Sequence, residues 1–446
     1  MSSNIEDFIN ENRISEVECI FSDFTGIARG KIIPAKKYLA ERIFKLPEYV
    51  FFHTVTGNSP DDTDDLTDSS EGDMLLKPDY STASQVLWTQ DLTANVIHDC
   101  VKRDGSDVEF APRNVLKRVL ACYDEKNWQP ILAPEMEFYL TQIDSSPHNP
   151  LKPPLTRFKR VESGGSAYSM DHLSNFDPLL ETLYQFCEAQ QMEIDTLNHE
   201  YGTAQLEINF LHGPALKLAD DVFRFKRACR EAAIRHQMIA TFMAKPLEDQ
   251  SGSAMHFHQS VIDKTTGKNI FVDENGEFSQ NFYYFIGGLQ KYIKPLMIFF
   301  APNVNSYRRL IPDCSAPVDV EWGIDNRNVG LRVPISGAIN TRVENRVSGA
   351  DTNPYLAFAC SLAAGFLGIT EKIEPNQRVT GSNYKKISLL PKTLTESLTL
   401  LDESSSAHKM LGERFVKAFK LVKQCELDDY SKVISSWERN FLLLNV

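Results

Sequence analysis

Glutamates at alternate positions of an apolar run constrain the fold of this chain more than any other feature. Residues 129–140 (QPILAPEMEFYL) are typical of a strand, and Glu135 and Glu137 in it are two residues apart, so both point to the same face. Two like carboxylates side by side repel each other. Either this face lies in water, or a hard dication lies between the carboxylates.

A second acidic stretch follows further along the chain. Residues 198–210 (NHEYGTAQLEINF) place Glu200 and Glu207 at the two ends of a stretch that enters an apolar strand. Carboxylate oxygens are the ligands that hard dications prefer. The four glutamates of the two segments therefore indicate a metal cage.

Histidines share a strand face in residues 253–261 (SAMHFHQSV). Alternation there puts His256, His258 and Ser260 on one side of the strand. Two histidines followed by a hydroxyl suit a metal ligand and phosphate donors. A polar face that satisfies its own hydrogen bonds is the alternative.

Arginines and a glutamate alternate in residues 341–347 (TRVENRV), so that Arg342, Glu344 and Arg346 share one face. Such a row can also be a plain salt-bridge ladder. The same half of the chain contains Arg308, Arg309, Arg327 and Arg332. Because guanidinium groups bind phosphate and carboxylate bidentately, the combined residues favour a site for a metal-bound nucleotide and a carboxylate substrate, and hence phosphoryl transfer.

Composition and charge limit the kinds of binding partner and the cellular compartment that we expect for this protein. The chain has 446 residues with 47 Lys+Arg against 60 Asp+Glu, a net charge of −13 that repels nucleic acid and anionic lipid. Its 8 cysteines show no CxxC spacing, which favours reduced thiols. Residues 1–12 do not resemble a signal peptide, and the longest apolar stretch, residues 354–369, is too short for a bilayer. We expect a cytoplasmic protein with neither a nucleic-acid nor a membrane partner.

Local patterns predict several elements. Residues 17–33 contain two apolar runs around a turn and predict a hairpin. The acidic residues 58–73 predict a solvated loop. Residues 220–244 predict a helix that begins at a capping pair of aspartates. A helical pattern that starts near Pro112 indicates the beginning of a second, larger domain.

In sequence order, these residues resemble the motifs of the glutamine synthetase family over almost the whole chain, most closely its γ-glutamylpolyamine synthetase branch. The matching motifs are Glu135-x-Glu137, Glu200 with Gln205-x-Glu207, Gly252 with Met255-His256-x-His258-Gln259-Ser260, Asn305-Ser306-Tyr307-Arg308-Arg309, Asn326-Arg327 with Leu331-Arg332-x-Pro334, and Arg342-x-Glu344-x-Arg346.

The resemblance implies an α+β fold in two domains. An N-terminal β-grasp domain would comprise residues 1–108, and a C-terminal catalytic domain with a curved antiparallel sheet and flanking helices would comprise residues 109–446. It also implies a dodecamer of two hexameric rings, with each active site between neighbouring subunits.

The resemblance further implies roles for single residues. Glu137, Glu200 and Glu207 would hold one Mg²⁺ or Mn²⁺, and Glu135, His256 and Glu344 the second. Gly252, Arg309 and Arg346 would bind glutamate. His258, Ser260, Arg327, Arg332 and Arg342 would contact ATP, the cosubstrate. Arg327, Glu344 and Arg346 would be the catalytic residues.

Two departures from the family concern the ammonium site. Ser315 stands where the family usually has a glutamate, and the segment at Phe52-His53 lacks the usual aspartate. We therefore expect an ATP-dependent ligase that joins the γ-carboxylate of L-glutamate, through γ-glutamyl phosphate, to putrescine or another polyamine, with Ser315 at the amine site. An ammonia-using glutamine synthetase with a relocated ammonium site is one alternative. A non-catalytic structural or nitrogen-sensing protein of the same family is the other.

Overall fold

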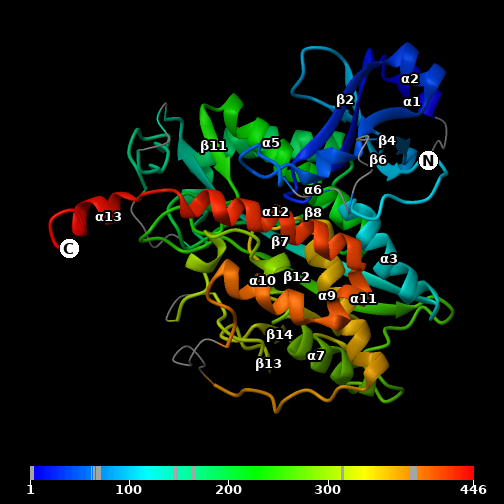
Figure 1. The fold of residues 1–446 in the computed structure, drawn as a ribbon, viewed down its shortest axis with the longest axis vertical. Coiled ribbons are helices and arrows are strands. Elements are labelled where there is room, and N and C mark those ends of the chain that lie inside the picture. Colours follow the sequence, from blue (N-terminus) through cyan, green and yellow to red (C-terminus); the bar gives the residue numbers. More distant parts are fainter. Residues whose placement is uncertain are drawn as a thin grey trace.

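Two sheets, each formed by its own part of the chain, organise the fold (Figure 1). The structure is a computed structural model that describes the chain except residues 1–4, 62, 64–65, 67–71, 145, 147–148, 163–166, 313–315 and 382–388. Helices flank both sheets, so the predicted α+β class is confirmed. Half of the predicted acidic loop, residues 58–73, lies outside the described residues.

The first sheet has the strand order β2-β1-β6-β4-β3, with β5 paired to β6. Its strands are β1 (Glu16–Ser22), β2 (Ala28–Pro34), β3 (Phe44–Pro47), β4 (Asp73–Pro78), β5 (Ser84–Val86) and β6 (Thr93–Val101). The pair β1 and β6 is parallel, and the other pairs are antiparallel. Helix α1 (Ile5–Glu11) precedes β1 in the chain, and helix α2 (Ala35–Glu41) follows β2.

The predicted hairpin is confirmed, because β1 and β2 pair antiparallel from Glu16↔Pro34 to Ser22↔Ala28. One Asp23 carboxylate oxygen accepts hydrogen bonds from the backbone N–H groups of Thr25 and Ile27, both at 2.9 Å. Gly26 has a φ of +84°, which glycine adopts without the strain that a side chain would bring. The turn is thus specified by its own residues.

The second sheet has the order β13-β14-β15-β12-β7-β9-β8, and β10 and β11 also pair with β7. Its strands are β7 (Trp128–Gln142), β8 (Ile194–His199), β9 (Gln205–Phe210), β10 (Gly213–Pro214), β11 (Met238–Thr241), β12 (Met255–Asp263), β13 (Trp322–Ile324), β14 (Leu331–Val333) and β15 (Val343–Asn345). The sheet is antiparallel as predicted, except that β13 and β14 run parallel. The long strand β7 therefore joins both halves of the sheet.

The helices of the C-terminal part include one very apolar helix, α9, against which several of the others pack. They are α3 (Pro112–Asp124), α4 (Met170–Leu173), α5 (Asp177–Ala189), α6 (Ala215–Arg235), α7 (Gln280–Tyr292), α8 (Met297–Phe300), α9 (Pro354–Glu371), α10 (Leu394–Glu403), α11 (Ser405–Leu411), α12 (Glu413–Ser431) and α13 (Ser436–Phe441). Helix α9 packs mainly against α7, α3 and α6. Helix α13 projects from one side of the molecule (Figure 1).

Helix α9 corrects one expectation. It has 18 residues and, by length and composition alone, is the one helix among the described residues that could cross a membrane. The sequence predicted that this segment is too short, but the helix extends to Glu371 and reaches the lower limit for a span. In the fold 72% of that stretch is buried inside the protein, as in the core helix of a globular domain.

The helix predicted over residues 220–244 was wrong at both ends. Helix α6 begins at Ala215, and the aspartates lie inside it rather than capping it. It ends at Arg235, and Met238–Thr241 form β11 on the edge of β7. The proposed domain division after residue 108 stays a prediction, although β6 ends at Val101 and α3 begins at Pro112, on either side of that position.

Candidate active site

Neighbouring strands of the second sheet bring the predicted ligands to one face. Strands β9, β7, β12, β15 and β14 lie side by side in that order, and their register places several polar residues directly opposite one another. The facing pairs are Glu137 with Glu207, Glu135 with His256, His258 with Glu344, and Arg332 with Glu344. Directly opposed side chains on antiparallel strands are close neighbours, so strand register alone gathers this polar group.

Two overlapping groups of these residues have the ligand spacing of a metal site. The ligand atoms of Glu135, Glu207 and His256 all lie within 4.8 Å of one another, and so do those of Glu135, His258 and Glu344. The Nε2 atom of His258 donates to Glu135 at 2.9 Å. Glu135 belongs to both groups and therefore lies at their centre.

Glu207 is buried beside the other carboxylates of this cluster. Its residue is 8% exposed, and it accepts no hydrogen bond from the described residues. Burial and then the surrounding carboxylates, Glu135 first, raise its pKa to about 10. Buried acids that repel one another fit a site whose charge is balanced by a hard cation.

Glu137 is held more firmly by its neighbours. The backbone N–H of Ala254 donates to it at 2.9 Å and the amide of Gln205 at 3.2 Å. Burial and the charge of Glu200 nevertheless raise its pKa to about 8. The carboxylate is oriented by hydrogen bonds, and the charges of Arg309 and Arg346 offset only part of the increase in its pKa.

His256 supplies the nitrogen ligand of the group. Burial and the nearby charge of Arg346 lower its pKa to about 4, so the imidazole is neutral at physiological pH. A neutral imidazole is the form that coordinates metal ions. Its Nδ1 lies 3.7 Å from a Glu135 oxygen and 3.9 Å from one of Glu344.

Arginines border the acidic cluster on the side of Glu344. The two Glu344 oxygens accept hydrogen bonds from Arg332 at 2.8 Å and from Arg346 at 2.6 Å. Burial alone would raise the pKa of Glu344, but Arg346 holds it below its usual range. The alternative of a plain salt-bridge ladder is thus only partly realised: Glu344 pairs with Arg346 from the row and with Arg332 from β14, whereas Arg342 donates to the carbonyl of Asn340.

Arg309 is fixed by its own backbone surroundings. It donates to the carbonyl oxygens of Val347 at 2.8 Å and Arg346 at 2.9 Å. A Cβ on Gly252 would lie 2.7 Å from both the Ala244 carbonyl oxygen and the Arg309 side chain. Only glycine lets the chain pass so close to the aliphatic part of the Arg309 side chain.

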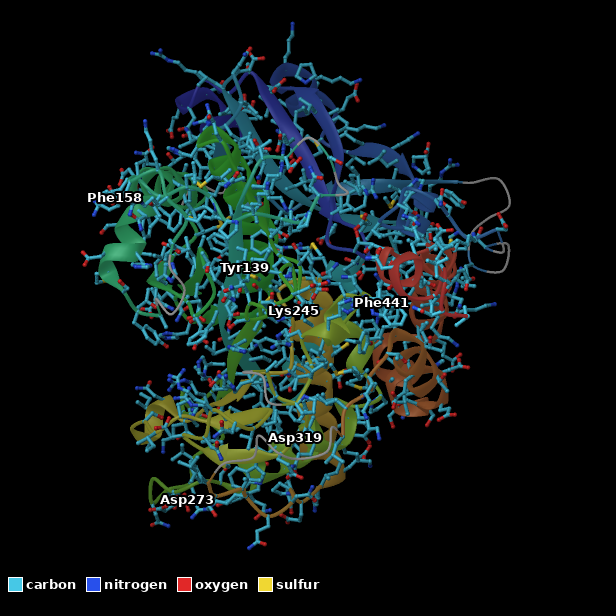
Figure 2. The ribbon with its side chains drawn as sticks, turned by 90° about the vertical axis from the view of Figure 1, so that its left-hand side faces the viewer. Tyr139, Phe158, Lys245, Asp273, Asp319 and Phe441 are labelled. Carbon is cyan, nitrogen blue, oxygen red and sulfur yellow. The ribbon has the colours of Figure 1, made fainter. Side chains whose placement is uncertain are left out.

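A cavity of about 900 Å³ lies along this face. The predicted site residues that line it are Glu135, Glu137, Glu200, Glu207, Gly252, His256, Arg309, Arg327, Arg332, Glu344 and Arg346. His258, Ser260 and Arg342 are not among its described lining residues. Ser315 lies outside the described residues. Tyr139 on β7 and the cavity residue Lys245 lie near the middle of the molecule (Figure 2).

The structure adds residues that the sequence patterns missed. Gln205, noted above only within a motif, donates to both Glu137 and the Gly252 carbonyl and so links two parts of the site. Arg378 lines a second cavity, of about 760 Å³, to which Arg327 also contributes. No strand alternation or repeat marks Arg378 in the sequence, so only the fold brings it near Arg327.

The sequence pattern of the glutamine synthetase catalytic domain matches residues 109–442. The chain belongs to the glutamine synthetase family. It is 32% identical to the glutamate–isopropylamine ligase of a Pseudomonas species, over 97% of this chain and 96% of that protein. It is 31% identical to the γ-glutamylputrescine synthetase PuuA of Escherichia coli K12, over 96% and 92%.

Other relatives carry a different name, and solved structures share the fold. Several proteins at similar identity are glutamine synthetases. A structure of GmaS without ligand superimposes with a TM-score of 0.85 at 27% identity and covers 99% of this chain and 100% of that one. The predicted family and fold are therefore confirmed.

Proposed function

We propose that the protein is an ATP-dependent ligase that joins the γ-carboxylate of L-glutamate to an organic amine larger than ammonia. The observation that carries the reaction type is the cavity in which buried, mutually repelling carboxylates meet a row of arginines. Such a site suits dications bound to a polyphosphate, beside guanidinium groups that bind a carboxylate substrate.

The donor set supports two hard dications. Glu137, Glu200 and Glu207 would hold one Mg²⁺ or Mn²⁺, and Glu135, His256 and Glu344 the other; all six line the cavity. When bound, the ions neutralise charge on the phosphates and on the transferring group. The division of the six residues between two ions is part of the proposal.

The arginines would bind and orient the reactants. Arg309 and Arg346 would hold glutamate, and Arg332 and Arg327 would hold the phosphates. Arg327 lines both cavities, which suits contact with an extended polyphosphate. A γ-carboxylate oxygen of glutamate attacks the γ-phosphorus of ATP, and the bond to ADP breaks. The amine nitrogen then attacks the acyl carbon, phosphate leaves, and the amine gives up a proton.

The amine is the finer part of the proposal, and we favour putrescine or a longer polyamine. The sequence lacks the acids expected around ammonium at Ser315 and near His53. An alkyl chain regains affinity at about 0.8 kcal/mol for each buried CH₂. Glu248 and Asp249, both exposed, also line the cavity and could attract a second ammonium group.

A phosphate-release assay with glutamate, ATP and Mg²⁺ tests the proposal. The amines are ammonium, isopropylamine, ethanolamine, putrescine, cadaverine, spermidine and spermine. We expect kcat/KM to be much higher for putrescine or spermidine than for ammonium. It should rise towards alkaline pH, because the attacking amine must be deprotonated. In Ser315→Glu the ratio of the two kcat/KM values should shift towards ammonium.

Each alternative has its own outcome in this assay. A preference for ammonium over every alkylamine would identify an ammonia-using glutamine synthetase. A preference for isopropylamine over the diamines would retain the ligase and refute the polyamine. Absence of phosphate release with every amine would favour a non-catalytic member of the family.

A further inference from the structure

The turn between β8 and β9 is held at both ends by one buried carboxylate. The Nε2 atom of His199 donates to an oxygen of Glu162 at 3.0 Å, and the backbone N–H of Ala204 donates to the same oxygen at 2.8 Å. The side chains of Glu162 and His199 are 1% and 0% exposed. One side chain therefore spans the turn from residue 199 to residue 204.

Glu162 comes from a segment that is otherwise at the surface. Residues 157–161, directly before it, are all exposed. A charged residue is an unusual choice for the buried anchor of such a segment, since an apolar side chain would avoid the cost of burying charge. Its hydrogen bonds to the turn account for the carboxylate.

The same turn carries two residues of the candidate active site. Glu200 follows His199, and its backbone N–H donates to the Gln205 carbonyl at 2.8 Å. The second ring nitrogen of His199 donates to the Glu200 carbonyl at 2.7 Å. At the other end, Gln205 follows Ala204 and donates to Glu137 at 3.2 Å. Movement of the turn would displace both Glu200 and the support of Glu137.

We propose that Glu162 is a positioning residue for the metal site: by binding His199 and Ala204 it fixes the turn that presents Glu200 and Gln205. Glu162 is not among the described residues that line the active-site cavity. The inference rests on the role proposed above for Glu200 and is independent of which amine is used.

A transition-metal ion at Glu162 is the competing interpretation. Glu162, His172 and His199 have ligand atoms within 4.8 Å of one another. His172 Nδ1 lies 3.5 Å from a Glu162 oxygen and has no hydrogen-bond partner among the described residues. The direct contact of His199 with Glu162 and the additional bond from Ala204 favour the clamp, in which His172 contributes only the packing of its ring against that of His199, with the ring centroids 5.7 Å apart.

This difference defines the experiment, made on the purified full-length protein. Mn²⁺ binding is measured by electron paramagnetic resonance for the wild type, Glu162→Ala, Glu162→Gln and His172→Ala. We expect Glu162→Ala to weaken Mn²⁺ binding at least about tenfold, as loss of outer-shell support does at other metal sites. Glu162→Gln should recover part of this loss, because its amide oxygen can still accept from Ala204, and His172→Ala should match the wild type.

Hydrogen exchange over residues 196–206 provides a readout that needs no metal. Exchange in this segment should be faster in Glu162→Ala and unchanged in His172→Ala, whereas a purely global loss of stability would speed exchange throughout. Unchanged Mn²⁺ affinity or unchanged local exchange in Glu162→Ala would overturn the proposal. So would stoichiometric zinc in the wild type that His172→Ala loses. A wild type that binds no Mn²⁺ would refute the role of Glu200, and the exchange data would then test the clamp alone.

Discussion

Glu207 lies opposite Glu137 on neighbouring strands, buried among other carboxylates. Glu207→Gln keeps the volume and removes the repulsion, so we expect the melting temperature in EDTA to stay the same or rise. Ligase activity should fall at least about 100-fold, because a ligand of the proposed metal site is lost. Melting curves and initial rates measure the two effects. The exposed Glu193→Gln is the control that should change neither, and wild-type turnover by folded Glu207→Gln would contradict the assignment.

The same carboxylates predict how pH and metal act on stability. Burial and neighbouring acids raise the pKa values of Glu137 to about 8 and Glu207 to about 10, from an ordinary 4.5. Between that ordinary value and the raised ones, the metal-free folded protein holds more protons than the unfolded chain, so these groups make it less stable as pH rises. A dication displaces those protons, and its affinity should increase at least about tenfold per pH unit between about pH 6 and 8.

Thermal melts with and without Mg²⁺ at these two pH values check the sign. The stabilisation by Mg²⁺ should be larger at the higher pH, and Glu207→Gln should flatten the difference. Equal stabilisation at both values in the wild type would rule out coupled proton release from these acids.

At the scale of elements, α3 is tied to the first sheet and to α6 through Arg113. This buried guanidinium donates to Asp99 on β6 at 2.6 Å, to Asp79 at 2.7 Å and to Asp220 on α6 at 2.8 Å. We expect Arg113→Met to lower the free energy of unfolding by about 3–5 kcal/mol, because it leaves the buried Asp220 carboxylate without its cationic partner. Urea unfolding measures this, with the exposed Lys37→Ala as a control that should cost no more than about 0.5 kcal/mol. A similar small effect for Arg113→Met would show that the network contributes little.

Patterns with a short period were predictable from the sequence. The alternation that puts Glu135 and Glu137 on one face is a property of the strand itself. The hairpin of β1 and β2 is specified by the residues of its turn. For helix α6, the aspartates suggested a cap, but Asp220 pairs with Arg113, which lies more than a hundred residues earlier. A pairing over that distance leaves no local signal.

Cross-strand register was equally hidden. The sequence places Glu344 in a row with its own neighbours, whereas the fold places it opposite His258 and between Arg332 and Arg346. Which strands become neighbours depends on packing of the whole sheet. The residue types of the site were therefore predictable, and several of their contacts were not.

At the scale of the whole molecule, the C-terminal end is apolar and exposed. Trp437 and Phe441 are 59% and 54% exposed on a helix that projects from the body of the protein (Figure 1), and Leu444, after the end of this helix, is 91% exposed. Exposed apolar surface of this kind marks an interaction site. We expect the full-length protein to form the dodecamer implied by its family and a variant lacking residues 436–446 to form smaller species, as measured by sedimentation. A stable, active full-length monomer would contradict this prediction.

The burial of α9 has a consequence for how the chain is made. The helices that cover it most, α3, α6 and α7, all precede it in the sequence. Because a protein is synthesised from its N-terminus, their surfaces leave the ribosome before α9 does. The apolar helix α9, which would adhere to other chains if exposed, is thus synthesised after the helices that cover it. A circular permutant that begins at residue 354 would keep the same contacts and reverse this order, and newly synthesised chains should aggregate more.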